Sequence, residues 1–144
     1  MPLHKQDKEL DALTDELGGI AAFDGLDRRS LSALAGAGRV VHLPSGWAVV
    51  SEDQPADSVY VLLGGDTEVR HGADVVAHLG TGALVGEAAL IDRRRRNASV
   101  ITTTEVRALR LNYDDLPGVF GRHSDVEDAF RREWERKATS AAPV

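Results

Sequence analysis

The stretch VGEAALIDRRRRNASV, residues 85–100, holds the side chains of this chain that are best suited to binding an anion. Gly86 is followed by Glu87 and by one turn of good helix formers, and the N–H groups that begin a helical turn attract negative charge. Because Gly86 has no Cβ, a ligand can approach its backbone closely. The Glu87 carboxylate can accept hydrogen bonds from hydroxyls, and Arg96 supplies a guanidinium. Together these groups suit a sugar that bears a phosphate.

Arg96 ends a run of four arginines and begins a predicted strand. Alternation along a strand puts Arg96, Ala98 and Val100 on one face, and Asn97 and Ser99 on the other. A guanidinium on the apolar face is costly unless it meets an anion. The pattern therefore favours an inward-pointing arginine that has a specific partner.

Other interpretations of the same residues stay open. The arginines before Arg96 can form a solvated loop, and Arg95 is a rival for the inward position. Glu87 and Arg96 can also form a structural salt bridge in a protein that binds no ligand, because a fold does not fix a function. These alternatives need a structure or a binding experiment to separate them.

Composition restricts the class of protein. The chain has 144 residues, enough for one domain, and its net charge of −6 disfavours direct nucleic-acid binding. It has no cysteine and no apolar run long enough to span a membrane, so we expect a cytoplasmic protein. Its five histidines show no ligand spacing and no motif of a nucleophile appears, so we expect no metal, no catalytic residue and no enzyme.

The elements that must position residues 85–100 follow from hydrophobic periodicity. Helical spacing predicts one helix over 5–20 and a second that follows the N-cap residue Asp27 and is stopped by Gly36 and Gly38. Seven or eight short strands follow from Arg39, separated by turns, which favours a sandwich, roll or barrel. Helical spacing returns after Asn112, where Pro117-Gly118 divides two segments and is the expected hinge for a movement of the last helix. The last helix carries an apolar stripe. Its members are Val126, Phe130 and Trp134.

The two halves of the anion-binding stretch resemble a known motif. G-E-x-A-L, then five residues, then R-x-A-S-V is similar to the phosphate-binding cassette of the cyclic nucleotide-binding domain family. The resemblance extends upstream through LPSGWAVVSEDQPADSVYVLLGGDTEV and covers most of the chain. The matching cassette residues are Gly86, Glu87, Ala89, Leu90, Arg96, Ala98, Ser99 and Val100.

The resemblance implies a role for individual residues. Glu87 is expected to bind the ribose 2′-hydroxyl and Arg96 the cyclic phosphate. Backbone N–H groups of Ala88 and Ala98 are expected to add phosphate contacts. Asn97 stands where some members of the family contact the phosphate or a guanine, so it does not separate cAMP from cGMP.

The resemblance also implies the fold and the function. It implies a mostly β protein, a double-stranded, jelly-roll-like β-roll over 39–111, with helices over 1–38 and 112–144 in a single domain. The implied function is a regulatory module for signal transduction that binds cAMP, with no other cofactor, and signals by moving its C-terminal helix. Trp134 is a candidate cap over the base, and core packing is its alternative role. Partners other than the cyclic nucleotide stay open between a homodimer and an effector protein. The alternative function is a ligand-free roll that serves protein interaction.

Overall fold

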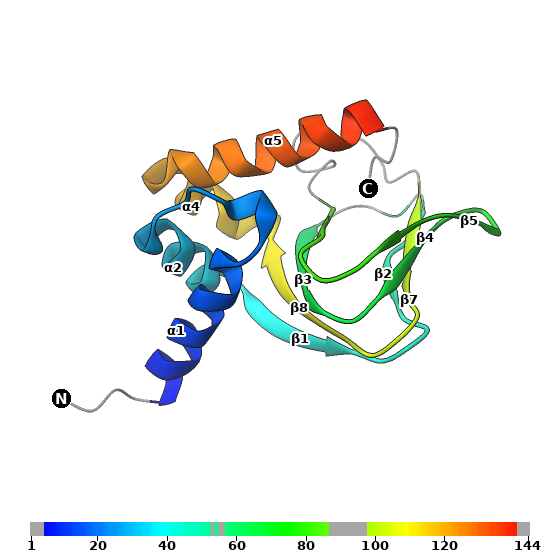
Figure 1. Cartoon of the computed structure of the whole chain (residues 1–144), viewed down its shortest axis with the longest axis horizontal. Helices are drawn as coiled ribbons and strands as arrows, with labels where there is room; N and C mark the ends of the chain where they lie inside the picture. The colour runs from blue at the N-terminus through cyan, green and yellow to red at the C-terminus, as the bar shows by residue number, and fades with distance from the viewer. Residues whose placement is uncertain (1–4, 53, 55–56, 87–97, 141–144) are drawn as a thin grey trace.

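The computed structural model describes residues 5–52, 54, 57–86 and 98–140, with helices near both ends and strands between them (Figure 1). The helical elements are α1 (Lys5–Gly18), η1 (Ala21–Phe23), α2 (Arg28–Ala37), η2 (Tyr113–Asp115), α4 (Leu116–Arg122) and α5 (Ser124–Ser140). The strands are β1 (Arg39–Leu43), β2 (Ala48–Val50), β3 (Ser58–Gly64), β4 (Thr67–His71), β5 (Asp74–Leu79), β6 (Leu84–Val85), β7 (Ser99–Thr102) and β8 (Val106–Asn112).

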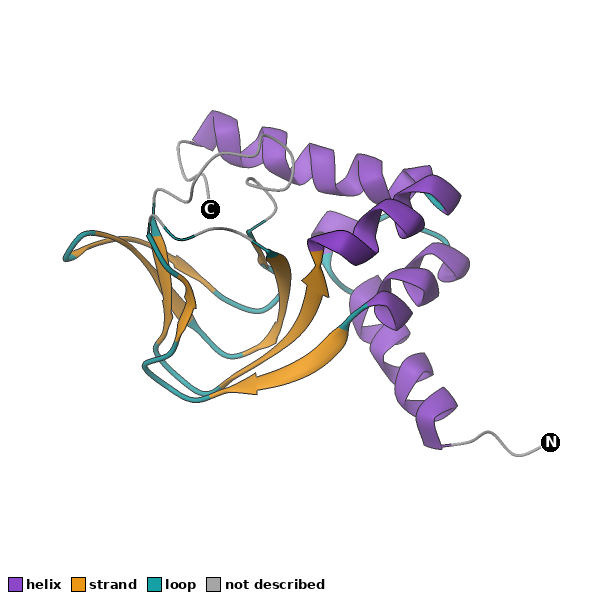
Figure 2. Cartoon of the chain, turned by 180° about the vertical axis from the view of Figure 1, so that it is seen from behind, coloured by secondary structure: helices purple, strands orange, loops and turns teal. Residues whose placement is uncertain are grey.

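The strands form two antiparallel four-stranded sheets. The orders are β1-β8-β3-β6 and β2-β7-β4-β5, so most neighbours in a sheet are distant in sequence. The sheets face each other as a roll, and α1, α2 and α4 gather at one side of it while α5 runs along one end (Figures 1 and 2). The predicted β-roll with N-terminal and C-terminal helices is confirmed.

Strand β3 explains how one sheet contributes to two cores. Its alternate residues Val59, Val61 and Leu63 belong to the cluster that packs against the helices. Leu62 belongs to the second cluster, which lies between the two sheets, and Tyr60 packs against that cluster. Both faces of β3 are therefore covered, and its sequence is a continuous apolar run for that reason.

The helical side of the molecule is held by large apolar side chains. Leu17, Phe23, Leu34 and Phe130 are almost completely buried, each at 1% exposure or less. Phe130 of α5 stacks on Phe23 with ring centroids 6.1 Å apart and meets Phe120 of α4 edge-on at 5.5 Å. Each such side chain contributes about 1.5–3 kcal/mol when it leaves water, so the base of α5 is firmly fixed.

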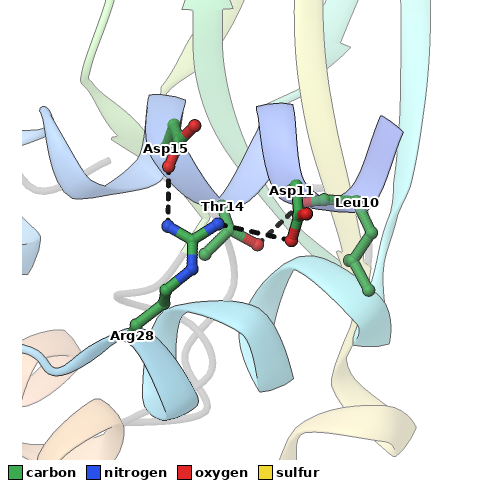
Figure 3. Close-up of polar contacts among 5 residues, drawn as sticks. All are labelled: Leu10, Asp11, Thr14, Asp15 and Arg28. Carbon is green, nitrogen blue, oxygen red and sulfur yellow. Dashed lines mark hydrogen bonds and ion pairs between the residues drawn. The ribbon is translucent and has the colours of Figure 1, made fainter. Parts of the chain in front are cut away.

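Polar contacts also join the first two helices. Arg28 at the start of α2 donates to Asp15 at 2.6 Å and to Asp11 at 3.3 Å, both on α1 (Figure 3). In the same view the Thr14 hydroxyl donates to the Leu10 carbonyl at 2.7 Å within α1. Because Arg28 is exposed, its ion pairs add little to stability.

Another ion pair joins α1 to the roll. Arg107 of β8 donates from both terminal nitrogens to the Glu16 carboxylate at 2.7 and 2.8 Å. Arg107 alternates with Ala108, so it points to the helical side while Ala108 belongs to the cluster between the sheets.

The predicted helix with Asp27 as its N-cap is confirmed; of the two glycines expected to stop it, Gly38 is the C-cap of α2 and Gly36 is not a stop. The Asp27 side chain accepts a hydrogen bond from the Ser30 N–H at 2.9 Å and caps α2. Gly36 lies inside α2, which ends at Ala37. A Cβ at Gly38 would lie 2.7 Å from the Arg110 carbonyl oxygen, so glycine at this position lets β8 approach the chain closely.

Two further features differ from the expectation. Strand β6 has only two residues, too few to show alternation, and was not predicted. Pro117 and Gly118 lie in the first turn of α4, where proline's missing N–H costs no helical bond. The helix break lies instead at His123, which caps α4 with φ −136° and ψ 78°.

Candidate functional site

The described structure reaches the cassette from both sides. Gly86 is its last described residue on one side, and Ala98 and Ser99 are the first on the other. Five of the predicted ligand-binding residues lie outside the described residues, so their roles stay predictions. These are Glu87, Ala88, Ala89, Arg96 and Asn97.

Gly86 follows β6 in a conformation that favours glycine. It is buried, and its φ of 98° lies in the region that residues with a Cβ rarely adopt. The Tyr113 hydroxyl donates to the Gly86 carbonyl oxygen at 2.6 Å. Gly86 is therefore needed for the backbone geometry itself, in addition to any close approach by a ligand.

Ala98 and Val100 point into the roll as strand alternation predicts. They are 6% and 0% exposed and belong to the cluster between the sheets. Val85, next to Gly86, belongs to the same cluster. Both described ends of the cassette are thus anchored in one apolar layer, where Ala98, like Ala108, is a small buried side chain.

Ser99 points to the other face of β7 and has a partner in the protein. Its hydroxyl oxygen accepts from the Glu52 N–H at 2.8 Å. The Glu52 carboxylate accepts from the Gly72 N–H at 3.1 Å and lies 3.0 Å from His71 Nδ1. The Gly72 bond first and the His71 bond second lower the pKa of Glu52. Ser99 therefore joins β7 to the loop after β2, and Glu52 joins that loop to the β4–β5 hairpin.

The stripe on α5 divides into two parts. Val126 and Phe130 are completely buried in the helical core, whereas Trp134 is only half-buried. Trp134 lies one turn beyond Phe130, on the half of α5 that runs along the end of the roll (Figure 1). This partial exposure is compatible with either role predicted for Trp134, core packing or a base cap.

Two residues near the cassette were missed from the sequence. Lys137 of α5 is 3% exposed, and its ammonium donates to the Leu84 carbonyl oxygen on β6. Tyr113 makes the corresponding contact to Gly86. A lysine in a highly charged helix predicts a solvated side chain. Both contacts are made to backbone carbonyl oxygens, which every residue has, so the sequence could not predict either of them.

A serine, a histidine and an aspartate meet where α2 joins α5. The Ser30 hydroxyl lies 2.8 and 3.0 Å from the Asp125 carboxylate oxygens and 3.4 Å from His123 Nδ1. A hydrolytic triad needs the histidine between an accessible serine and the acid, but here the serine donates to the acid and is 2% exposed. The cluster therefore joins α2 to α5 and does not have the geometry of a catalytic triad.

The described surface also contains a groove of about 450 Å³ between α2 and α4. Its lining includes the small residues Ala33, Gly36 and Gly118, with Arg122 and His123 at its edge. Among the described residues, its lining comes from the helical side and includes no residue of a strand. In the described parts of the chain, no three metal-ligating side chains cluster, and no helix has the length and hydropathy to cross a bilayer.

Comparisons with known proteins agree with this geometry. Residues 40–123 match the model of the family described as cyclic nucleotide-binding domain. The chain is 25% identical over 120 residues to a CRP-like cAMP-activated global transcriptional regulator of Mycobacterium tuberculosis, a match that covers 80% of this chain and 54% of the regulator. It is 31% identical over 104 residues to a cAMP-dependent protein kinase regulatory subunit of Aspergillus niger, covering 70% of this chain and 25% of the subunit.

A solved structure titled "Sp-2Cl-cAMPS bound to PKAR CBD2" superimposes with a TM-score of 0.78 at 15% identity, covering 98% of this chain and 97% of that one. That likeness supports the fold. The chain spans about half the length of the bacterial regulator, which is therefore larger than the unit described here. Because the family model covers more than half of the chain, including all of residues 85–100, the chain belongs to the cyclic nucleotide-binding domain family.

Proposed function

We propose that this chain is a regulatory module that binds cAMP through residues 85–100 and signals through α5. The observation that carries the proposal is the anchoring of both cassette ends in one layer of the roll: Val85 and Ala98 share the cluster between the sheets. Gly86 stands at the entrance with the positive φ that the turn requires. Family membership supplies the ligand class.

The proposed contacts follow the chemistry of a cyclic nucleotide. Glu87 accepts from the ribose 2′-hydroxyl, and Arg96 pairs with the phosphate. The N–H groups of Ala88 and Ala98 add donors to the phosphate, while Ala89 completes the turn. Asn97 accommodates cAMP or cGMP, so cGMP is the alternative ligand.

For Ser99 we propose a supporting role. Its hydroxyl already accepts from the Glu52 N–H, so the side chain fixes the neighbouring loop while its backbone continues β7 beside the cassette. Ser99 thus helps to keep the strand that follows Arg96 in place.

The proposed signal is a movement of the second half of α5. The base of the helix is fixed by Phe130, whereas Trp134 beyond it is half-buried and is proposed to cap the base. We place the joint at His123, where α4 and α5 meet, and Pro117-Gly118 is the alternative. A ligand moves such an equilibrium only through its different affinities for the two states.

The module is proposed to work in the cytoplasm without a catalytic step, a metal or direct contact with nucleic acid or membrane. Residues 1–144 are proposed to act as one domain, in which the roll over 39–111 holds the cassette. Its output goes to a second copy or to an effector protein. The second candidate function is a ligand-free roll for protein interaction. The half-buried Trp134 favours it, because an aromatic side chain that no ligand covers can contact another protein.

Arg96 provides the test of the proposed site. Arg96→Ala should weaken cAMP binding by about 2–3 kcal/mol, because a charge-assisted and partly buried bond is lost. Arg93→Ala is the matched control and should change little. Competition with a fluorescent cAMP analogue measures both. Equal losses in the two variants would replace a specific site with a diffuse electrostatic patch.

A further inference from the structure

Lys137 is a buried cation for which the proposed function has no use. The chain has fourteen arginines but only three lysines, and the other two are Lys5 and Lys8. Burying an ammonium is costly unless it finds hydrogen-bond acceptors. Its described acceptor is the carbonyl of Leu84, on a strand 53 positions away.

The Leu84 carbonyl needs this donor because of its place in the sheet. Strand β6 is the edge strand beside β3, and the Leu62 N–H donates to the neighbouring Ala83 carbonyl at 2.9 Å. Successive carbonyls of a strand point in opposite directions, so that of Leu84 points away from β3. Leu84 is completely buried, and a buried carbonyl without a donor would be costly. Lys137 therefore satisfies the outer edge of β6.

The same edge receives a second donor two residues later. Tyr113 of η2 donates to the Gly86 carbonyl at 2.6 Å. Tyr113, at the beginning of the C-terminal helical region, and Lys137, near its end, thus donate to Gly86 and Leu84, the two residues that flank Val85. The strand that leads into the cassette is therefore joined at this edge to α5, which carries Trp134, by the Lys137 bond and to η2 by the Tyr113 bond.

On its own helix, Lys137 faces an acid. Glu133 lies one turn earlier and its side chain is 11% exposed. Its pKa is lowered first by the hydrogen bond from Arg136 and further by the charges of Arg136 and Lys137. The Glu133 carboxylate thus balances positive charge at the place where α5 meets β6.

From this arrangement we propose that Lys137 is a positioning residue: its bond to Leu84 docks the second half of α5 on the cassette entrance and thereby sets the place of Trp134. Trp134 and Lys137 are three residues apart and so lie on neighbouring positions of one helix face. Loss of the bond releases this half of α5, while Phe130 still holds its base. The effect on ligand affinity rests on the proposed function, but the docking of the helix does not.

The absence of cysteine from the chain allows a clean test. Lys137→Cys, alkylated under denaturing conditions with bromoethylamine and refolded, regains an ammonium at nearly the length of lysine. Alkylation with a propyl halide gives a neutral group of similar shape. The native chain taken through the same cycle, and Arg132→Met on the exposed part of the same helix, are the controls.

The first measurement needs no ligand. In a Trp47→Phe background, acrylamide quenching reports the exposure of Trp134. We expect quenching to rise in the propylated protein and to stay at the native level in the aminoethylated protein and in Arg132→Met. Equal quenching in the propylated and aminoethylated proteins would overturn the proposal, because packing alone would then hold the helix.

The second measurement is the affinity for cAMP. A docked α5 keeps Trp134 over the ligand, so the propylated protein should bind about tenfold more weakly, with aminoethylation restoring the affinity. Unchanged affinity together with raised quenching would overturn the coupling between the helix position and the site. If the native chain fails to bind cAMP, the proposed function fails, and the quenching comparison still decides whether Lys137 docks the helix.

Discussion

At the scale of the residue, the proposed site includes a backbone position, Gly86, as well as charged side chains. Gly86 combines burial, a positive φ and a carbonyl held by Tyr113. Each of these features fixes the direction in which the chain enters residues 87–97. The conformation would be strained for any residue with a Cβ, so the glycine has a structural reason that is independent of the ligand.

We therefore predict that Gly86→Ala destabilises the protein even without ligand, by about 1–3 kcal/mol, because alanine must adopt a left-handed φ. Gly36→Ala is the matched control, since Gly36 lies inside α2 and a Cβ there meets open space. That change should leave stability equal or raise it by up to about 1 kcal/mol. Urea unfolding followed by circular dichroism measures both. A loss in the control as large as that in Gly86→Ala would show that strain at Gly86 is unimportant.

Glu87 gives a second prediction at this scale, in which a change in the ligand is combined with a change in the protein. The proposed bond to the ribose means that 2′-deoxy-cAMP should bind the native chain more weakly than cAMP. In Glu87→Ala the difference between the two nucleotides should shrink, because the acceptor is gone. Calorimetric titration with both nucleotides provides the comparison. Equal affinity of the native chain for both would remove Glu87 from the site.

At the scale of the element, polar contacts to the carboxylates of Asp27 and Asp125 cap and join the helices, and the charge of a carboxylate depends on pH. Asp27 caps α2, and the hydrogen bonds from the backbone and then the side chain of Ser30 lower its pKa. Ser30 also donates to Asp125 of α5, so the start of α2 and the start of α5 are linked through one hydroxyl. The ends of these helices thus share a network that fixes the base of α5.

The lowered pKa of Asp27 determines how this carboxyl group changes the stability of the protein with pH. A carboxyl group that ionises more easily when folded stabilises the protein above its unfolded pKa of about 3.9, and this contribution is lost as pH falls through the lower folded value. Asp27→Asn should keep the cap at neutral pH, since both residues cap well, and should show a smaller loss of stability on acidification. Asp27→Ala should lose stability at neutral pH as well. Thermal unfolding at neutral and acid pH tests this, and an acid sensitivity of Asp27→Asn equal to that of the native chain would refute it.

At the scale of the whole molecule, the fold could be predicted because its signals are local. The segments RVVHL and DVVAHL match β1 and β5 residue for residue, since turn residues bound them on both sides. Strand β6 escaped prediction because two residues carry no period. Of the site, the inward direction of Ala98 followed from alternation, and its burial confirms it. The contacts of Lys137 with Leu84 and of Tyr113 with Gly86 depend on the meeting of distant segments, which no local pattern encodes.

The central claim, that the roll carries a specific cyclic nucleotide site, is tested most directly by calorimetric titration of the native chain with cAMP, cGMP and 5′-AMP. We predict saturable binding of one cAMP per chain, because the proposed site offers the compact cyclic phosphate the N–H groups of a turn and one guanidinium. The open, more highly charged 5′-AMP should give no saturable heat at the same concentrations. Binding of cGMP in place of cAMP would change the ligand and keep the site. The absence of saturable heat with both cyclic nucleotides, or equal binding of 5′-AMP, would contradict the account.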